Sequence, residues 1–206
     1  MKPEQPQEET VMTVHADHTA AIDLVARALD QAGEVLAGVE PGQAALPTPC
    51  ASWNVRDLVE HLVDEVGQFA AVTAGGTRGP NRPLTGDDWT AAYREQADAL
   101  LAAWRSPGAF DRVIVFPFGE LPAAWTIDQQ VAELVIHAWD LAKASGQPTE
   151  LDRELGEHVL GWAPGVLTGE VRGSEADGMH IGPEVAVDAE APLYDRLAAL
   201  GGRDPR

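Results

Sequence analysis

The sequence has few basic residues and almost no cysteine. Its 14 lysines and arginines stand against 33 aspartates and glutamates, which gives a formal net charge of -19. Affinity for nucleic acids and for anionic membrane surfaces comes from clustered lysine and arginine, so neither kind of partner is expected. The single cysteine, Cys50, excludes an intramolecular disulfide and fits a reducing compartment, so we expect a cytoplasmic protein.

Long apolar runs are also missing, and no pattern typical of a secretory signal peptide is expected from the first residues. No window reaches the roughly 20 uninterrupted apolar residues that a membrane span requires. The polar, acidic start has no basic region followed by an apolar core, and residues 1–15 are expected to form a disordered leader. The hydrophobic fraction of 45% is that of a globular protein, so we expect residues 16–206 to form a single domain.

Apolar residues recur at spacings of three and four in several segments, which is typical of amphipathic helices. The pattern predicts long helices over residues 17–37, 54–74, 87–104 and 126–144, and shorter ones near 152–162 and 192–200. Thr126 is expected to cap the fourth helix, with Gln129 completing a capping box. The β-branched residues 112–116, followed by a turn, predict a short hairpin or extended connection. The fold class is therefore all-α, a four-helix bundle with short extra C-terminal helices.

Glu133 and His137 lie four residues apart in an almost wholly apolar stretch of the fourth predicted helix. Side chains at this spacing project from one face, so a single helix offers two ligands to one metal ion. His61, in the middle of the second predicted helix, is the candidate third ligand. Two imidazoles, one carboxylate and an open fourth position suit Zn²⁺, with Ni²⁺, Fe²⁺ and Mn²⁺ as alternatives. On spacing alone, a buried hydrogen-bonded pair without a metal is slightly favoured.

Three neighbouring residues complete the candidate site. Asp140 follows His137 by three residues, so it either orients His137 and transfers protons in the pocket or forms a salt bridge with Arg56. Trp53 and Arg56 are the candidate substrate-binding residues, and Trp139 is a second candidate for the pocket wall.

The remaining histidines, carboxylates and the cysteine are expected to have structural or surface roles. Glu65 is interpreted as part of a solvated helix face. His158 and His180 are single histidines, and residues 15–18 belong to the polar start of the first helix. Cys50 is expected to be a packed or loop-held thiol, because the sequence places no histidine and no basic residue other than Arg56 near it.

Residues 48–63 resemble the T-P-C-x-x-W-x-V-R-D-L-x-x-H-L segment of the actinobacterial, mycothiol-dependent maleylpyruvate isomerase-like N-terminal family. This family belongs to the DinB/YfiT-like metalloenzyme superfamily. Residues 133–142 resemble its D/E-x-x-x-H-x-W-D-L-A helix, and residues 192–205 resemble the tail of its small stand-alone members. The resemblance covers residues 17–205. It implies a DinB-like four-helix bundle with a divalent metal, usually zinc, held by His61, Glu133 and His137, and it implies that Asp140 lies near the active site.

The same resemblance implies a metal-dependent S-transferase or isomerase that uses mycothiol as co-substrate and acts on a small electrophile. The metal would bind the thiol sulfur and lower its pKa. The isomerase proper has a C-terminal domain for which the chain after Leu167 is too short, so maleylpyruvate isomerisation itself is not expected. A metal-assisted hydrolase and a non-catalytic metal-binding or stress-response protein are the alternatives, and a homodimer formed through a helix face is compatible with the sequence.

Overall fold

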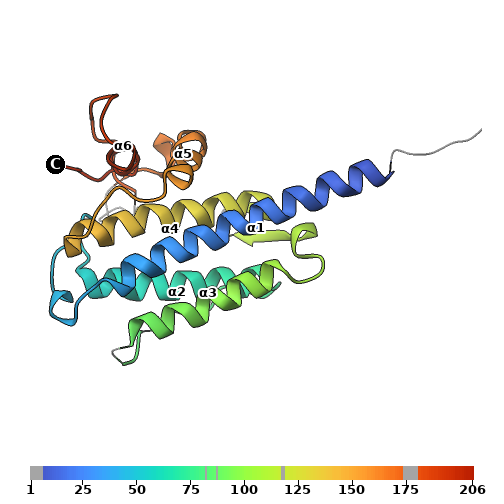
Figure 1. Ribbon diagram of the computed structural model, residues 1–206, viewed down its shortest axis with the longest axis horizontal. Coiled ribbons are helices and arrows are strands. Elements are labelled where there is room, and N and C mark those ends of the chain that lie inside the picture. The colour runs from blue at the N-terminus through green and yellow to red at the C-terminus, as the bar shows by residue number, and fades with distance from the viewer. Residues whose placement is uncertain (1–6, 82, 87, 117–118, 174–180) are drawn as a thin grey trace, which may run out of the picture.

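Four long helices dominate the computed structural model, which describes residues 7–206 except 82, 87, 117–118 and 174–180. They are α1 (Gln7–Ala37), α2 (Val55–Thr73), α3 (Trp89–Trp104) and α4 (Ala123–Ser145). α1 and α2 each pack against α3 and α4, so the four helices form a bundle (Figure 1). The predicted all-α class and four-helix architecture are confirmed. No helix within the described ranges is long and apolar enough to cross a membrane.

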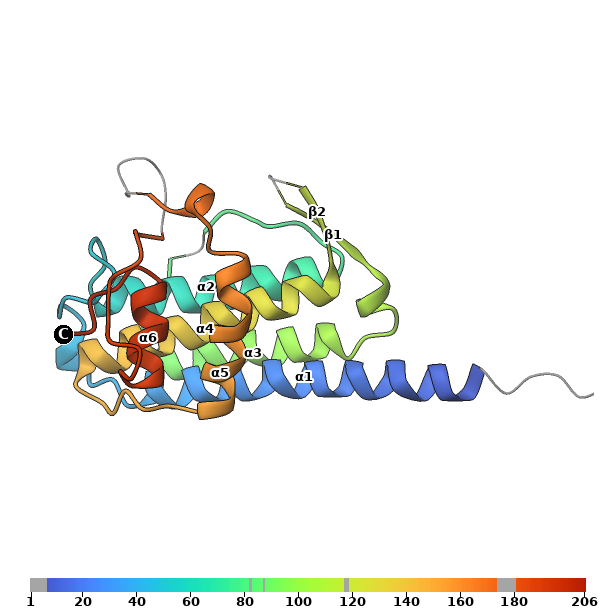
Figure 2. The ribbon, with the colours of Figure 1, turned by 90° about the horizontal axis from the view of Figure 1, so that it is seen from above.

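Short elements complete the chain. β1 (Val113–Phe116) pairs antiparallel with β2 (Gly119–Pro122), and this is the hairpin predicted before the fourth helix. α5 (Arg153–Trp162) and α6 (Leu193–Leu200) pack on each other and on α4, and they lie together over one side of the bundle (Figures 1 and 2). Single 3₁₀ turns lie at Pro41–Gln43, Ala109–Asp111, Ala163–Gly165 and Gly169–Val171.

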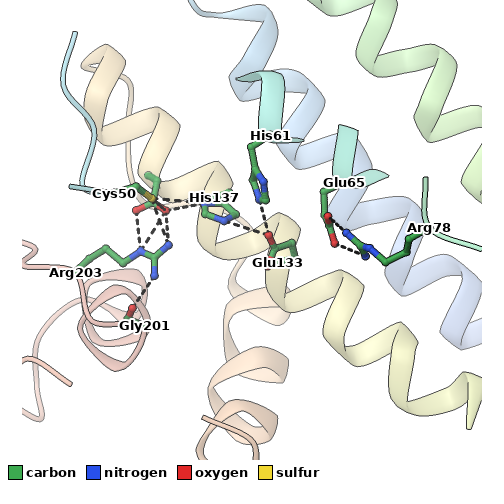
Figure 3. Close-up of polar contacts among 9 residues, drawn as sticks. Cys50, His61, Glu65, Arg78, Glu133, His137, Gly201 and Arg203 are labelled. Atoms are coloured by element: carbon green, nitrogen blue, oxygen red, sulfur yellow. Dashed lines mark hydrogen bonds and ion pairs between the residues drawn. The ribbon is translucent and has the colours of Figure 1, made fainter. Parts of the chain in front are cut away.

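The start of α2 is fixed by its own sequence. Asn54 Oδ1 accepts a hydrogen bond from the Asp57 amide at 3.0 Å, and the Asp57 carboxylate accepts one from the Asn54 amide at 3.0 Å. This reciprocal capping box satisfies two amides that would otherwise lack partners. The apolar stripe that follows is buried and consists of Val55, Leu58, Val59, Leu62, Val66 and Phe69. His61 lies beside this stripe and faces α4, as Figure 3 shows.

The start of α4 differs from the prediction. The helix begins at Ala123, and the Thr126 hydroxyl donates to the Ala123 carbonyl at 2.7 Å inside the first turn instead of capping it. The hairpin leads directly into the helix, and the Ala123 amide donates to the Arg112 carbonyl at 3.3 Å. Thr126, which the sequence pattern predicted as the cap, therefore lies inside the helix. The predicted end is confirmed, because Gly146 has a left-handed φ of 73° directly after Ser145.

The start of α1 also differs from the prediction. The helix begins at Gln7, before the predicted start at residue 17, and residues 1–6 lie outside the described part of the chain. No proline or glycine occurs between Pro6 and Gly33, so nothing in this stretch interrupts a helix once it has formed. Figure 2 shows the first turns of α1 extending past the other helices.

Replacing the cap of α2 should destabilise the protein. We expect Asn54→Ala to lower the free energy of unfolding by about 1 kcal/mol, because an amide in the first turn loses its partner. The measurement is chemical denaturation. Glu95→Ala, on the exposed side of α3, is the control and should change stability by less than about 0.5 kcal/mol. Equal effects of the two substitutions would contradict this explanation of where α2 begins.

Candidate functional site

The three predicted metal ligands lie together between α2 and α4. His61 Nε2 is 2.8 Å from Glu133 Oε1, and His137 Nε2 is 3.2 Å from the same oxygen. One ligand atom from each residue lies within 4.8 Å of those of the other two. Figure 3 shows His61 projecting from α2 toward Glu133 and His137 on α4. The arrangement predicted from helical spacing, with His61 opposite the Glu133–His137 pair, agrees with this geometry.

The three side chains differ in their exposure to solvent. The side chains of His61 and Glu133 are 26% and 31% exposed, whereas that of His137 is 7% exposed. The Trp53 ring lies beside both imidazoles at a tilt, with centroid distances of 4.5 Å to His61 and 5.8 Å to His137. Trp53 therefore borders the group, and its predicted contact with a substrate stays a prediction. Trp139 is buried in the helix core, with 1% of its surface exposed.

Asp140 holds the other ring nitrogen of His137. Its Oδ2 lies 2.9 Å from His137 Nδ1, and the carboxylate is fully buried. Its ionic partner is Arg203, whose Nη2 donates to Oδ2 at 3.0 Å and whose Nε donates to Oδ1 at 3.2 Å. The alternative of a salt bridge between Asp140 and Arg56 is wrong, because Arg56 pairs with Glu60 one turn along α2 at 3.0 Å.

The surroundings of Cys50 differ from those expected from the sequence. Its thiol donates to Asp140 Oδ2 at 3.3 Å and lies 3.9 Å from His137 Nδ1. Arg203 Nη2 donates to the sulfur at 3.5 Å. A histidine and a basic residue therefore both contact this thiol, because the loop before α2 folds back onto α4 and onto the chain after α6.

His137 belongs to two groups through its two nitrogens. Nε2 faces Glu133 and His61, and Nδ1 faces Asp140 and Cys50. These are the two groups of side chains among the described residues that could hold a metal ion. The second group also contains the Arg203 guanidinium, whose positive charge disfavours a cation there. The first group is therefore the better candidate for a metal.

The charges of the first group depend on one another. Burial alone would raise the pKa of Glu133, but the attraction of His137 and hydrogen bonds with His137 and His61 hold this pKa well below its usual value. Burial alone would lower the pKa of His137, but attraction to Glu133 and hydrogen bonds with Asp140, Cys50 and Glu133 raise it well above the usual value. Without a metal, the site is thus an ion-paired cluster centred on a protonated His137.

Asp140 is kept ionised in the same way. Burial opposes its charge, but the attraction of Arg203 and the hydrogen bond with His137 lower its pKa. A charged Asp140 is a hydrogen-bond acceptor only, so the proton between the two residues belongs to His137 Nδ1. This leaves Nε2 as the nitrogen that is available to a metal.

The other sequence predictions for single residues have mixed outcomes. Arg56 is held by Glu60 and by the Leu84 carbonyl, so its predicted substrate contact stays a prediction. Glu65 is not a freely solvated carboxylate, because its side chain is 15% exposed and pairs with Arg78 from the loop after α2. Figure 3 shows this pair beyond Glu133. His158 pairs with Asp128 at 2.8 Å in a structural role, and His180 lies outside the described residues.

The pH dependence of the metal-free protein should reflect His137. Because its folded pKa is raised, its contribution to stability is complete below the unfolded value of about 6.5 and is lost as pH rises through the folded pKa. The Glu133 contribution, from a lowered pKa, is lost as pH falls below about 4.3. NMR titration of the His137 ring measures the first value directly, and Asp140→Asn should lower it. A His137 pKa at or below about 6.5 would contradict the ion-paired cluster.

Comparison with known proteins relates most of the chain to one protein family. Residues 25–142 match the family described as the mycothiol maleylpyruvate isomerase N-terminal domain. Two uncharacterized proteins, from two strains of Mycobacterium tuberculosis, are each 35% identical over 183 residues, which is 87% of this chain and 96% of theirs.

Two solved structures share the fold. The match to a crystal structure of the mycothiol-dependent maleylpyruvate isomerase covers 85% of this chain and 78% of the isomerase chain, with a TM-score of 0.63 at 17% sequence identity. A histidine-to-alanine variant of that enzyme gives a TM-score of 0.61 at 15% identity. The matched family segment contains Cys50, Trp53, His61, Glu133, His137 and Asp140, and Arg203 lies outside it. The chain therefore belongs to the mycothiol maleylpyruvate isomerase N-terminal domain family.

Proposed function

We propose that the protein holds one divalent metal ion with His61, Glu133 and His137 and acts as a thiol-dependent S-transferase or isomerase on a small electrophile. The observation that carries the proposal is the convergence of two imidazoles and one carboxylate, with Glu133 Oε1 2.8 Å and 3.2 Å from the two Nε2 atoms. The thiol is proposed to be mycothiol, because the solved relative is a mycothiol-dependent maleylpyruvate isomerase.

The donor set fits a metal ion chemically. Two imidazole nitrogens and one carboxylate oxygen from helices are a common three-ligand set for Zn²⁺, and they also suit Ni²⁺, Fe²⁺ and Mn²⁺. Glu133 carries its charge in a partly buried position, which a cation would offset in place of the His137 proton. Zn²⁺ is our first choice because these donors are borderline in softness and the described residues bring three ligating side chains together at this group, without a fourth.

The protein's own residues have distinct tasks in this proposal. Asp140 accepts a hydrogen bond from His137 Nδ1 at 2.9 Å, which fixes the ring and directs Nε2 toward Glu133. Trp53 covers the two imidazoles and excludes water from that side. A divalent ion held there would bind a thiol sulfur and lower its pKa, which makes the thiolate available at neutral pH.

An open coordination position favours a reactive role over a purely structural one. A closed site needs a fourth protein ligand, and Cys50 is the obvious candidate by type. Its sulfur, however, lies on the Nδ1 side of His137, opposite the nitrogen that faces Glu133. The exposed fractions of His61 and Glu133 leave the remaining side accessible to a small molecule.

The substrate is proposed to contact Trp53 and Arg56. Trp53 offers an aromatic face beside the imidazoles, and Arg56, whose side chain is 42% exposed, is the one lysine or arginine of α2. The net charge of -19 repels small anions at long range, so an anionic electrophile would depend on such a local cation or on the metal itself.

Metal content tests the first half of the proposal. The purified protein should bind about one equivalent of Zn²⁺, as measured by elemental analysis and by competition with a chelator. His61→Ala, Glu133→Ala and His137→Ala should each weaken binding by more than the roughly 10–100-fold typical of losing only a ligand's hydrogen-bond partner. His158→Ala, which removes a histidine from a pair with Asp128, is the matched control and should bind like the wild type. If each of the three single variants still bound about one equivalent of Zn²⁺ with wild-type affinity, the proposed site would be wrong.

Thiol binding tests the second half. Cobalt-substituted protein should change its visible absorption when mycothiol is added, since a thiolate that enters the open position alters the ligand field. Zinc-loaded protein should release about one proton for each thiol bound, as measured in a weakly buffered solution. No affinity for mycothiol or any other small thiol would contradict a thiol-dependent activity. Turnover of esters or amides without added thiol would indicate the alternative, a metal-assisted hydrolase.

A further inference from the structure

Arg203 is placed by the way α6 ends. Gly201 is the C-cap, Gly202 has a left-handed φ of 85°, and the Arg203 amide donates to the Ala198 carbonyl at 2.9 Å. The Gly202 amide donates to the Ala199 carbonyl at 3.0 Å, which completes the pair of bonds of a Schellman motif. This helix ending reverses the chain directly after α6 and directs the Arg203 side chain toward α4 (Figure 3).

Two further contacts fix this segment. A Cβ on Gly202 would lie 2.8 Å from backbone atoms of Gly182, so the two backbones meet at a distance that only glycine allows. Lys143 on α4 donates to the Pro205 carbonyl at 2.7 Å. The backbone before and after Arg203 is therefore fixed. The fold of this segment, and not only the side-chain rotamer, brings Arg203 to the site.

The guanidinium of Arg203 is buried and almost fully engaged. Its exposed fraction is 8%, and Nη1 donates to the Gly201 carbonyl at 2.6 Å. Nε and Nη2 donate to the Asp140 carboxylate at 3.2 Å and 3.0 Å, and Nη2 also reaches the Cys50 sulfur. Such a planar fork fixes the plane of a carboxylate in a way that a single ammonium cannot.

The same carboxylate oxygen that Arg203 binds also holds His137. Asp140 Oδ2 lies 3.0 Å from Arg203 Nη2 and 2.9 Å from His137 Nδ1. We infer that Arg203 is a positioning residue for the metal site: it orients Asp140, which sets the tautomer and direction of the His137 ring whose Nε2 faces Glu133. This inference rests on the proposed metal site. It extends that site to residue 203, beyond the segment that matches the family.

Stability alone does not account for this buried pair. Removing two charges from water costs several kcal/mol per ion, and well-packed apolar side chains of similar volume are often as stabilising or more so. The pair has a geometric consequence that an apolar pair would lack, because it holds the Asp140 carboxylate in the direction of His137 Nδ1.

Zinc affinity of full-length variants tests the inference. We expect Arg203→Met to weaken zinc binding about tenfold or more, as measured by chelator competition on folded protein. Arg203→Lys keeps the charge and loses the fork, so its loss should be smaller. Arg206→Ala, which removes an exposed arginine three residues further along the same segment, is the control and should bind like the wild type.

A double-mutant comparison separates positioning from simple stabilisation. If Arg203 acts through Asp140, Arg203→Met should have little further effect on zinc affinity in an Asp140→Asn background. A merely structural Arg203 would lower the melting temperature of the variant and leave the zinc affinity of the folded protein unchanged. NMR of the metal-free variants gives a second readout, because the His137 Nδ1 proton should lose its hydrogen-bonded shift in Arg203→Met.

The possible outcomes are distinct. Wild-type affinity in Arg203→Met, with weakened affinity in Asp140→Asn, overturns the inference and leaves the proposed function intact. A wild-type protein that binds no metal defeats the proposed function itself. If Arg203→Met does not fold, the zinc affinities of Arg203→Lys and Gly202→Ala replace it as the test. Gly202→Ala displaces the segment without removing a charge. Weakened zinc binding in both variants supports the inference, and wild-type binding in both overturns it.

Discussion

The site depends on the contacts that the two nitrogens of the His137 ring make. Its Nε2 lies 3.2 Å from Glu133 and its Nδ1 lies 2.9 Å from Asp140, so a single buried imidazole joins the solvent-facing group to the buried Asp140–Arg203 pair. Because an imidazole has only two nitrogens, fixing Nδ1 as the donor determines what Nε2 can bind. The rest of the structure supplies the elements that hold this ring: α4 carries it, α2 brings His61 opposite, and the chain after α6 locks Asp140.

The parts of the fold that were predictable from sequence are those with local signals. The apolar stripe of α2 gave the right helix in the right place, and the four-residue spacing of Glu133 and His137 put both side chains on one face of α4. The helix starts at Gln7 and Ala123 were missed. In the first case no amphipathic stripe marks the added turns, and in the second the entry is set by the hairpin instead of a capping side chain.

The innermost part of the site was not predictable because its contacts are distant in sequence. Arg203 is 63 residues from Asp140 and 153 residues from Cys50. Helical periodicity says nothing about such pairs, and it led to Arg56 as the partner of Asp140 and to Cys50 as an isolated thiol. A local signal did exist for the backbone: the Gly201–Gly202 pair after α6 predicts a Schellman ending, which reverses the chain directly before Arg203.

The proposed site holds a metal ion with an open position that accepts a thiol. X-ray absorption spectroscopy of the zinc-loaded protein examines this position, in the wild type and in Cys50→Ser. We expect only nitrogen and oxygen neighbours around zinc before mycothiol is added and one sulfur neighbour afterwards, in both proteins alike. A sulfur neighbour that is present before the thiol is added and lost in Cys50→Ser would show that Cys50 closes the site, and the absence of a sulfur neighbour afterwards would show that no thiol binds the metal.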